Sequence, residues 1–215
     1  MGFLSQSGYA IDPGTAVGDC NGIHPEASLA YYPVSASNFR LVEPSTPSQY
    51  IDFGDRKLVK IYSTDNPSLF LYADGSRVNP LNTSGVTYLG IYNNQNTWMP
   101  SDNFLFMKVG VSGDKILYTV WANIDGYLTD ATDLAFNSNG SVKNSNYIWD
   151  GMWARLSYEA VQSNNSVFSF RRIETGANDF LIETATGRYI RIHNGIPVVS
   201  SEGQRFNIVD MEPGL

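Results

Sequence analysis

The stretch Lys115-Ile116-Leu117-Tyr118-Thr119-Val120-Trp121 is a run of β-branched, aromatic and aliphatic residues with the length of a β-strand. Similar runs precede and follow it, at Leu58-Val59-Lys60-Ile61-Tyr62 and at Val167-Phe168-Ser169-Phe170-Arg171. Each run opens one unit of a pattern that occurs three times along the chain. A unit repeated at such intervals typically packs its apolar face against its own copies.

The three units share further features in the same order. Their second apolar strands are centred on Phe70, Tyr127 and Phe180, at intervals of 57 and 53 residues. Polar turns follow at residues 73–76, 130–133 and 184–187, and short apolar strands come next, around Val78, Leu134 and Ile190. Each unit closes on an aromatic strand, which contains Phe104, Trp153 or Phe206. Since no segment has a sustained helical period, the pattern predicts an all-β fold with little helix.

Turns between the strands are marked by Asp-Gly and Asn-Gly pairs: Asp74-Gly75, Asp125-Gly126, Asn139-Gly140 and Asn194-Gly195. Tight hairpin turns need positive φ angles, which these pairs supply. The strands on either side are therefore expected to pair as hairpins.

The closing strands resemble the Gln-x-Trp signature of ricin-B-type lectins. Gln204-Arg205-Phe206 matches the signature with Phe in place of Trp, and Gly151-Met152-Trp153 keeps the Trp without the Gln. Asp102-Asn103-Phe104 keeps neither residue. Together with the three units, the resemblance implies a β-trefoil, in which three repeats of about four strands surround a pseudo-threefold axis.

The implied trefoil domain covers residues 58–215, with repeats at about 58–113, 114–164 and 165–215. In such a domain the aromatic residues of the closing strands, Phe104, Trp153 and Phe206, would be buried together near the axis. Residues 1–57 differ, because five prolines separate their short apolar runs. That spacing favours extended segments over helix and predicts an N-terminal arm that packs on the core. A partly disordered leader is the alternative.

Composition excludes several kinds of partner. The chain has 14 basic and 21 acidic residues, a formal net charge of −7, and such a field repels the phosphate backbone of a nucleic acid. No apolar run approaches the roughly 18 residues of a membrane-spanning helix. The first residues lack a secretory signal, so we expect a cytoplasmic protein or one released by a route without such a signal. Cys20 is the only cysteine, which excludes an internal disulfide.

Motifs of catalysis and of metal binding are almost absent. The sequence has no phosphate loop, no zinc-protease histidine pair and no nucleophile elbow. Its two histidines, His24 and His193, are too few for most zinc sites. Cys20 and His193 could form a thiol–imidazole pair, but an idle cysteine and a surface histidine are the simpler interpretation. We therefore predict no enzymatic activity, no metal and no cofactor.

The lectin resemblance implies a shallow sugar pocket on a repeat, where a carboxylate accepts bonds from hydroxyls and an aromatic ring stacks on the sugar. The positions where that family carries its Asp hold Tyr72, Thr129 and Ile182, so turn residues would have to supply the carboxylate. The candidate residues of repeat 1 are Asp74, Asn96 and Trp98. Those of repeat 2 are Asp130 or Asp133, Asn146 and Trp149. Repeat 3 has no turn aspartate and no Trp, so it is predicted to bind no sugar. Packing tryptophans and ordinary turn aspartates are the alternative.

These features predict a carbohydrate-binding, lectin-like protein whose partners are glycans or a glycosylated receptor. Single shallow sites bind weakly, so useful avidity would require both sites or a homo-oligomer. The same fold serves other functions. Three alternatives stay open: a toxin component with a receptor-recognising trefoil, a protease inhibitor, and a self-assembling or storage protein.

Overall fold

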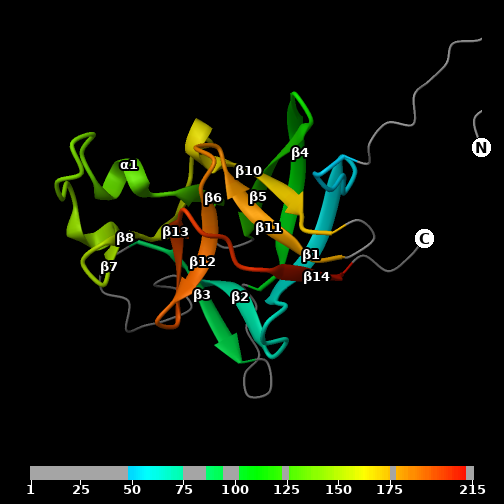
Figure 1. Cartoon of the computed structure of the whole chain (residues 1–215), viewed down its shortest axis with the longest axis horizontal. Helices are drawn as coiled ribbons and strands as arrows, with labels where there is room; N and C mark the ends of the chain where they lie inside the picture. The colour runs from blue at the N-terminus through cyan, green and yellow to red at the C-terminus, as the bar shows by residue number, and fades with distance from the viewer. Residues whose placement is uncertain (1–47, 75–85, 94–101, 123–125, 175–177, 212–215) are drawn as a thin grey trace, which may run out of the picture. The chain divides into compact units, whose positions relative to one another are not determined.

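The computed structural model describes residues 48–74, 86–93, 102–122, 126–174 and 178–211. Strands dominate these residues (Figure 1): β1 (Arg56–Ser63), β2 (Leu69–Asp74), β3 (Tyr88–Asn93), β4 (Phe104–Ser112), β5 (Lys115–Ala122), β6 (Gly126–Asp130), β7 (Ile148–Trp149), β8 (Trp153–Ala154), β9 (Leu156–Glu159), β10 (Val167–Arg172), β11 (Phe180–Thr184), β12 (Tyr189–His193), β13 (Ile196–Ser200) and β14 (Phe206–Asp210). Helix is confined to α1 (Thr132–Ala135) and the 3₁₀ turns η4 (Ser145–Tyr147) and η5 (Asn164–Ser166) in this part of the chain. The all-β class predicted from the sequence is confirmed.

Twelve strands form one antiparallel sheet, and β7 and β8 form a separate pair. Within the large sheet, six strands close into a ring through successive pairings: β1 with β4, β4 with β5, β5 with β10, β10 with β11, β11 with β14, and β14 with β1. The other strands extend from this ring as hairpins and short ladders, such as β2–β3 and β12–β13. The three apolar runs that open the units all lie in the ring, as β1, β5 and β10.

Aromatic rings fill the centre of the ring of strands. Phe106 and Phe170 stack with their ring centroids 4.5 Å apart, and Phe180 meets Phe170 edge-on at 5.3 Å. Phe104 and Phe206 are also completely buried in the same core. Aromatic residues of this size bury large apolar areas, so this cluster supplies much of the stabilisation of the fold.

Two positions of the second unit differ from their predicted places. Trp153 is half-buried and lies in β8, whereas Leu156 of β9, three residues later, is completely buried in the core. The aromatic residue was therefore the wrong marker of the closing strand, because the β7–β8 hairpin precedes that strand. Leu134, predicted in a strand, lies in α1. The Asp130 carboxylate accepts a bond from the Thr132 amide at 2.9 Å and starts this helical turn.

Residues 48–55 belong to the predicted arm and pack on the sheet. The Ile51 amide donates to the Phe170 carbonyl at 2.9 Å, and the Phe53 ring meets the Phe170 ring edge-on at 5.1 Å. The Tyr50 hydroxyl donates to the Glu183 carboxylate at 2.9 Å. Residues 1–47 lie outside the described residues, so the arm as a whole stays a prediction. Among the described helices, none has the length and apolar character needed to cross a membrane.

Candidate functional site

Two tight turns present polar and aromatic side chains at one place on the protein. The first connects β7 to β8, where Trp149 pairs with Trp153 across the hairpin. Asp150 follows Trp149 with a φ of 52°, and Gly151 has a φ of 74°. Positive φ is uncommon for residues other than glycine, and Asp and Asn tolerate it best. The turn therefore holds the Asp150 carboxylate at its tip.

The second turn connects β12 to β13, where His193 pairs with Ile196. Asn194 and Gly195 between them have φ angles of 48° and 79°. Positive φ at both central residues is the type I′ geometry that Asn-Gly favours. The hairpin turn predicted at Asn194-Gly195 is confirmed, and it places the side chains of His193 and Asn194 next to each other.

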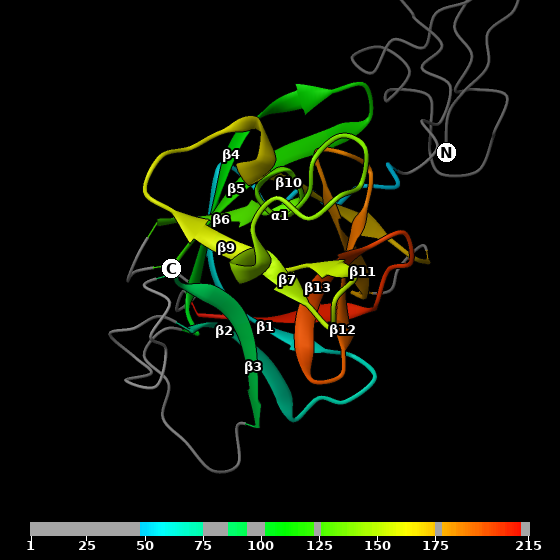
Figure 2. The same cartoon turned by 90° about the vertical axis from the view of Figure 1, so that its left-hand side faces the viewer.

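The two turns meet, as the neighbouring β7–β8 and β12–β13 hairpins in Figure 2 show. The Asp150 Oδ2 lies 3.1 Å from the His193 Nε2, and it accepts a bond from the Asn194 Nδ2, also at 3.1 Å. The Trp153 ring lies beside the imidazole of His193, with centroids 5.2 Å apart and planes inclined by 40°. We call Asp150, Trp153, His193 and Asn194 the turn cluster.

The turn cluster remains accessible to solvent. The Asp150 side chain is 54% exposed and the His193 side chain 28% exposed. Only one carboxylate oxygen of Asp150 is bonded to these two neighbours, so the other can accept bonds from a ligand. The cluster thus combines an oriented carboxylate, an amide, an imidazole and an indole ring, which is a set suited to neutral hydroxylated molecules.

Trp149 lies on the inner side of the same hairpin. The Arg155 guanidinium stands 3.5 Å from the centroid of the Tyr88 ring and 5.8 Å from that of Trp149. Burial lowers the pKa of Arg155, and the electron-rich aromatic faces partly compensate for its lost hydration. The indole nitrogen of Trp149 is buried and has no acceptor among the described residues. Trp149 is half-buried beside Arg155, and the indole nitrogen of Trp153 is likewise buried without an acceptor among the described residues.

The other predicted residues of repeat 2 have separate partners. Asp130 is 2% exposed and bonds to Thr132, whereas the Asp133 carboxylate accepts a bond from Asn165 at 3.0 Å. Asn146 lies in η4, which packs against α1, and its carbonyl accepts a bond from Tyr88 at 2.7 Å. The structure therefore brings the elements of Asp133 and Asn146 together and keeps Asp130 as an internal turn residue.

For repeat 1 only the aspartate can be described. Asp74 is the last residue of β2, and together with burial it raises the pKa of Tyr72 to about 12. Asn96 and Trp98 lie outside the described residues, as does Cys20. No three His, Cys, Asp or Glu side chains are placed to hold a metal ion within the described ranges.

The sequence pattern does not predict the turn cluster. It predicts only a turn at Asn194-Gly195 and a core position for Trp153. The third repeat, which was predicted to bind no sugar, contributes His193 and Asn194 to the turn cluster. A usable signal was present in Trp149-Asp150-Gly151-Met152-Trp153, where an Asp-Gly turn pair lies between two tryptophans.

Comparison with known proteins finds similarity in fold but no match in sequence. No family model and no curated protein matches the sequence. Among solved structures, a chain of the "PSL1a-E64 complex" is 15% identical with a TM-score of 0.50, over 74% of this chain and 49% of that one. A chain from "Structure and mode of action of a mosquitocidal holotoxin" is 15% identical with a TM-score of 0.51, over 75% of this chain and 18% of that one. "SeviL bound to asialo-GM1 saccharide" is 11% identical with a TM-score of 0.48, over 73% of this chain and 98% of that one.

The matched region therefore spans about half of the first of these chains and under a fifth of the holotoxin chain. At such identities the likeness shows the fold alone. This chain therefore shares its fold with parts of these two chains, and the comparisons carry no statement about its activity.

Proposed function

We propose that this chain is a carbohydrate-binding protein of the β-trefoil type, without enzymatic activity, and that the turn cluster contacts the sugar. The observation that carries the proposal is the position of the Asp150 carboxylate, fixed by His193 and Asn194 at 3.1 Å beside the Trp153 ring. The expected partner is a glycan, either free or on a glycosylated receptor.

The chemistry of the cluster suits a pyranose ring. The free oxygen of Asp150 would accept bonds from two neighbouring hydroxyls, and the Asn194 amide and His193 ring would contact a third. The exposed part of the Trp153 ring would pack against the C–H face of the sugar. Because the carboxylate is already oriented by two side chains, little conformational entropy is lost when the sugar binds.

The trefoil assignment is supported by the closed ring of strands. The opening strands of all three units, β1, β5 and β10, belong to this ring. The closing strands of the first and third units, β4 and β14, belong to it as well. Such a ring with outer hairpins is the expected architecture of three packed repeats.

The sugar-binding residues predicted from the sequence remain proposals. For repeat 1 these are Asp74, Asn96 and Trp98, and for repeat 2 they are Asp133, Asn146 and Trp149. Asp130 is better described as a turn residue, because its buried carboxylate bonds to Thr132. We place the turn cluster first, since its groups converge, Asp150 and Asn194 are exposed, and Trp153 and His193 are half-buried beside them.

A glycan array followed by titration of the best glycan tests the proposal. Asp150→Asn keeps a residue that tolerates positive φ and removes the charge, so affinity should fall about 10- to 100-fold. Trp153→Ala should weaken binding to a similar extent. The matched control is Asp65→Asn, because the Asp65 side chain is comparably exposed, at 51%, and pairs with Arg205 elsewhere. It should bind like the wild type.

If the array shows no binding, or if Asp150→Asn and Asp65→Asn bind equally well, the turn cluster is not a sugar site. A trefoil that recognises a protein, as a toxin component or an inhibitor, would then become the leading interpretation.

A further inference from the structure

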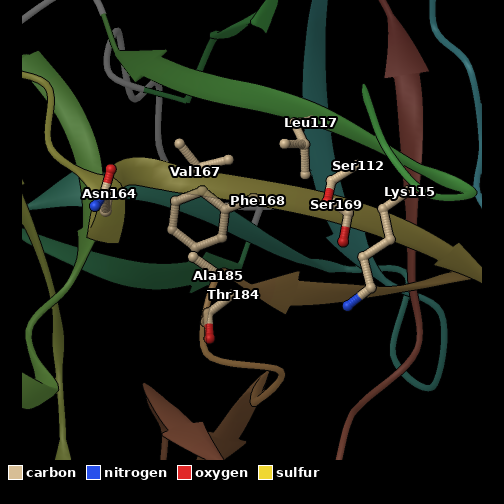
Figure 3. A pocket seen from close by; sticks show the side chains of 9 residues that line it. All are labelled: Ser112, Lys115, Leu117, Asn164, Val167, Phe168, Ser169, Thr184 and Ala185. Atoms are coloured by element: carbon tan, nitrogen blue, oxygen red, sulfur yellow. The ribbon is translucent and has the colours of Figure 1, made fainter. Parts of the chain in front are cut away.

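A pocket of about 370 Å³ opens between the β4–β5 hairpin, β10 and the turn after β11 (Figure 3). Its volume falls within the range of roughly 300–1,000 Å³ that is typical of small-molecule sites. None of the residues of the turn cluster lines it. The pocket is therefore a separate feature that the proposed glycan site does not explain.

Polar side chains line this pocket at two places, with Asn164 at one end and the two serines at the other. Ser169 is 3% exposed, and its hydroxyl has no hydrogen-bond partner in the described part of the chain. The Ser112 hydroxyl and the Asn164 amide, also on the pocket wall, likewise have no side-chain partner there. Figure 3 shows the two serine hydroxyls on the same side as Lys115. A hydroxyl that makes no bond within the protein and lines a pocket can bond to a ligand there.

The charge of Lys115 is already compensated. Its ammonium pairs with the Glu183 carboxylate, whose side chain is 4% exposed. The second carboxylate oxygen of Glu183 accepts the bond from Tyr50, and the Lys115 ammonium stands 5.7 Å from the centroid of the Tyr50 ring. An anionic ligand at Lys115 would be repelled by the neighbouring Glu183, and a cationic one by Lys115 itself. The site therefore favours a ligand without net charge.

The remaining wall is mostly apolar, and its one further hydroxyl, that of Thr184, already shares a hydrogen bond with Thr186. Leu117 and Val167 are half-buried at the edge of the pocket, and the completely buried Phe168 lies at its base. Figure 3 shows the Phe168 ring and Val167 across from the serine hydroxyls. A ring with C–H groups on its face and hydroxyl groups around its edge, as in a cyclic polyol, matches this lining.

We infer that this pocket binds a neutral cyclic polyol of monosaccharide size, with Ser112, Ser169 and Asn164 bonding to its hydroxyls and Leu117 and Val167 contacting its C–H groups. Lys115 retains N–H groups beyond its bond to Glu183 and can donate one to a ring or hydroxyl oxygen. The inference rests on this pocket alone and holds whether or not the turn cluster binds glycans.

The test uses the full chain carrying Asp150→Asn, so that the turn cluster does not contribute. D-glucose, D-galactose and myo-inositol are the neutral probes, with D-glucuronate and D-glucosamine as charged counterparts, and binding is followed by titration with ligand-observed NMR. At least one neutral probe should bind saturably, and the charged counterparts should bind at least about tenfold more weakly.

Two pairs of variants locate the site. Ala185→Phe adds a ring at the pocket wall and should abolish binding, whereas Ala160→Phe adds the same bulk at another exposed alanine and should leave it unchanged. Ser169→Ala should weaken binding about 2- to 10-fold, the effect of one hydrogen bond, and Ser138→Ala at an exposed turn should not. Circular dichroism confirms that each variant is folded.

The inference is overturned if none of the neutral probes binds, if D-glucuronate binds more tightly than every neutral probe, or if Ala185→Phe and Ser169→Ala bind like their controls. Should Ala185→Phe not fold, the serine pair alone decides, together with Ser112→Ala. Ala185→Phe is also made in the chain that keeps Asp150, where unchanged glycan-array binding would separate this pocket from the turn cluster.

Discussion

Asp150 and Asn194 are 44 positions apart, both have positive φ angles, and the Asn194 amide donates to the Asp150 carboxylate at 3.1 Å. The bond links the tips of two hairpins, so each turn holds the other in place. The unusual backbone at both positions is thus part of how the cluster is assembled.

Substitutions of Asn194 should separate turn geometry from ligand contact. Asn194→Gly keeps positive φ accessible and should change the free energy of unfolding by less than about 0.5 kcal/mol. Asn194→Ala should cost about 1–2 kcal/mol, because Ala disfavours the left-handed region. Both variants lose the amide, so both should bind the array-selected glycan about 2- to 10-fold more weakly. Urea denaturation and glycan titration measure the two effects, and equal stability of the variants would contradict the turn geometry.

Truncation of Leu156 should mainly lower the stability of the fold, whereas truncation of Trp153 should mainly impair glycan binding. Leu156→Ala creates a cavity in the core and should cost about 2–5 kcal/mol of stability. Trp153→Ala should cost less, because Trp153 is half-buried at the surface, yet it should impair glycan binding. Chemical denaturation of both variants checks this order. If Trp153→Ala lost more stability than Leu156→Ala, Trp153 would be the core residue of the second repeat, as predicted from the sequence.

The Tyr118 hydroxyl joins the segment before β1 to the ring of strands. It donates to the Asp52 carboxylate at 2.9 Å and accepts a bond from the Phe53 amide at 2.8 Å. Burial and this carboxylate raise the pKa of Tyr118, so the hydroxyl stays neutral across the physiological range. Tyr118→Phe leaves the Phe53 amide without its acceptor and should cost about 1–3 kcal/mol. Tyr62→Phe, at a half-buried tyrosine of β1, is the control and should be nearly neutral.

Asp52 should make stability depend on pH in the acid range. Its bonds to the Gly54 amide, Lys108 and Tyr118 lower the pKa of Asp52 below that of an unfolded chain. The carboxylate therefore stabilises the fold above a pH of about 4, and this contribution is lost as pH falls through the folded pKa. Asp52→Asn should be less stable than the wild type at pH 6, and the difference should shrink towards pH 2. A difference that is constant with pH would rule out this linkage.

Much of the architecture could be predicted from the sequence because it depends on residues that are adjacent in the chain. The opening runs of the units became β1, β5 and β10, and Asn194-Gly195 formed its turn, since strand propensity and turn chemistry depend on a few adjacent residues. The pairing of Asp150 with His193 depends instead on where two hairpins meet after folding. No local pattern reports such a meeting. The predicted core position of Trp153 was wrong for a related reason. An aromatic side chain suits a core position and a surface site equally well.

The closed ring of strands also limits how copies of this chain could associate. Each of its six strands has a hydrogen-bonded neighbour on both sides in the described structure. Unpaired strand edges are the usual starting points of runaway β-sheet growth between molecules, and the ring offers none. Among the described residues, pairing with a strand of another molecule is therefore left to the outer hairpins, where β13 ends the strand order of the large sheet.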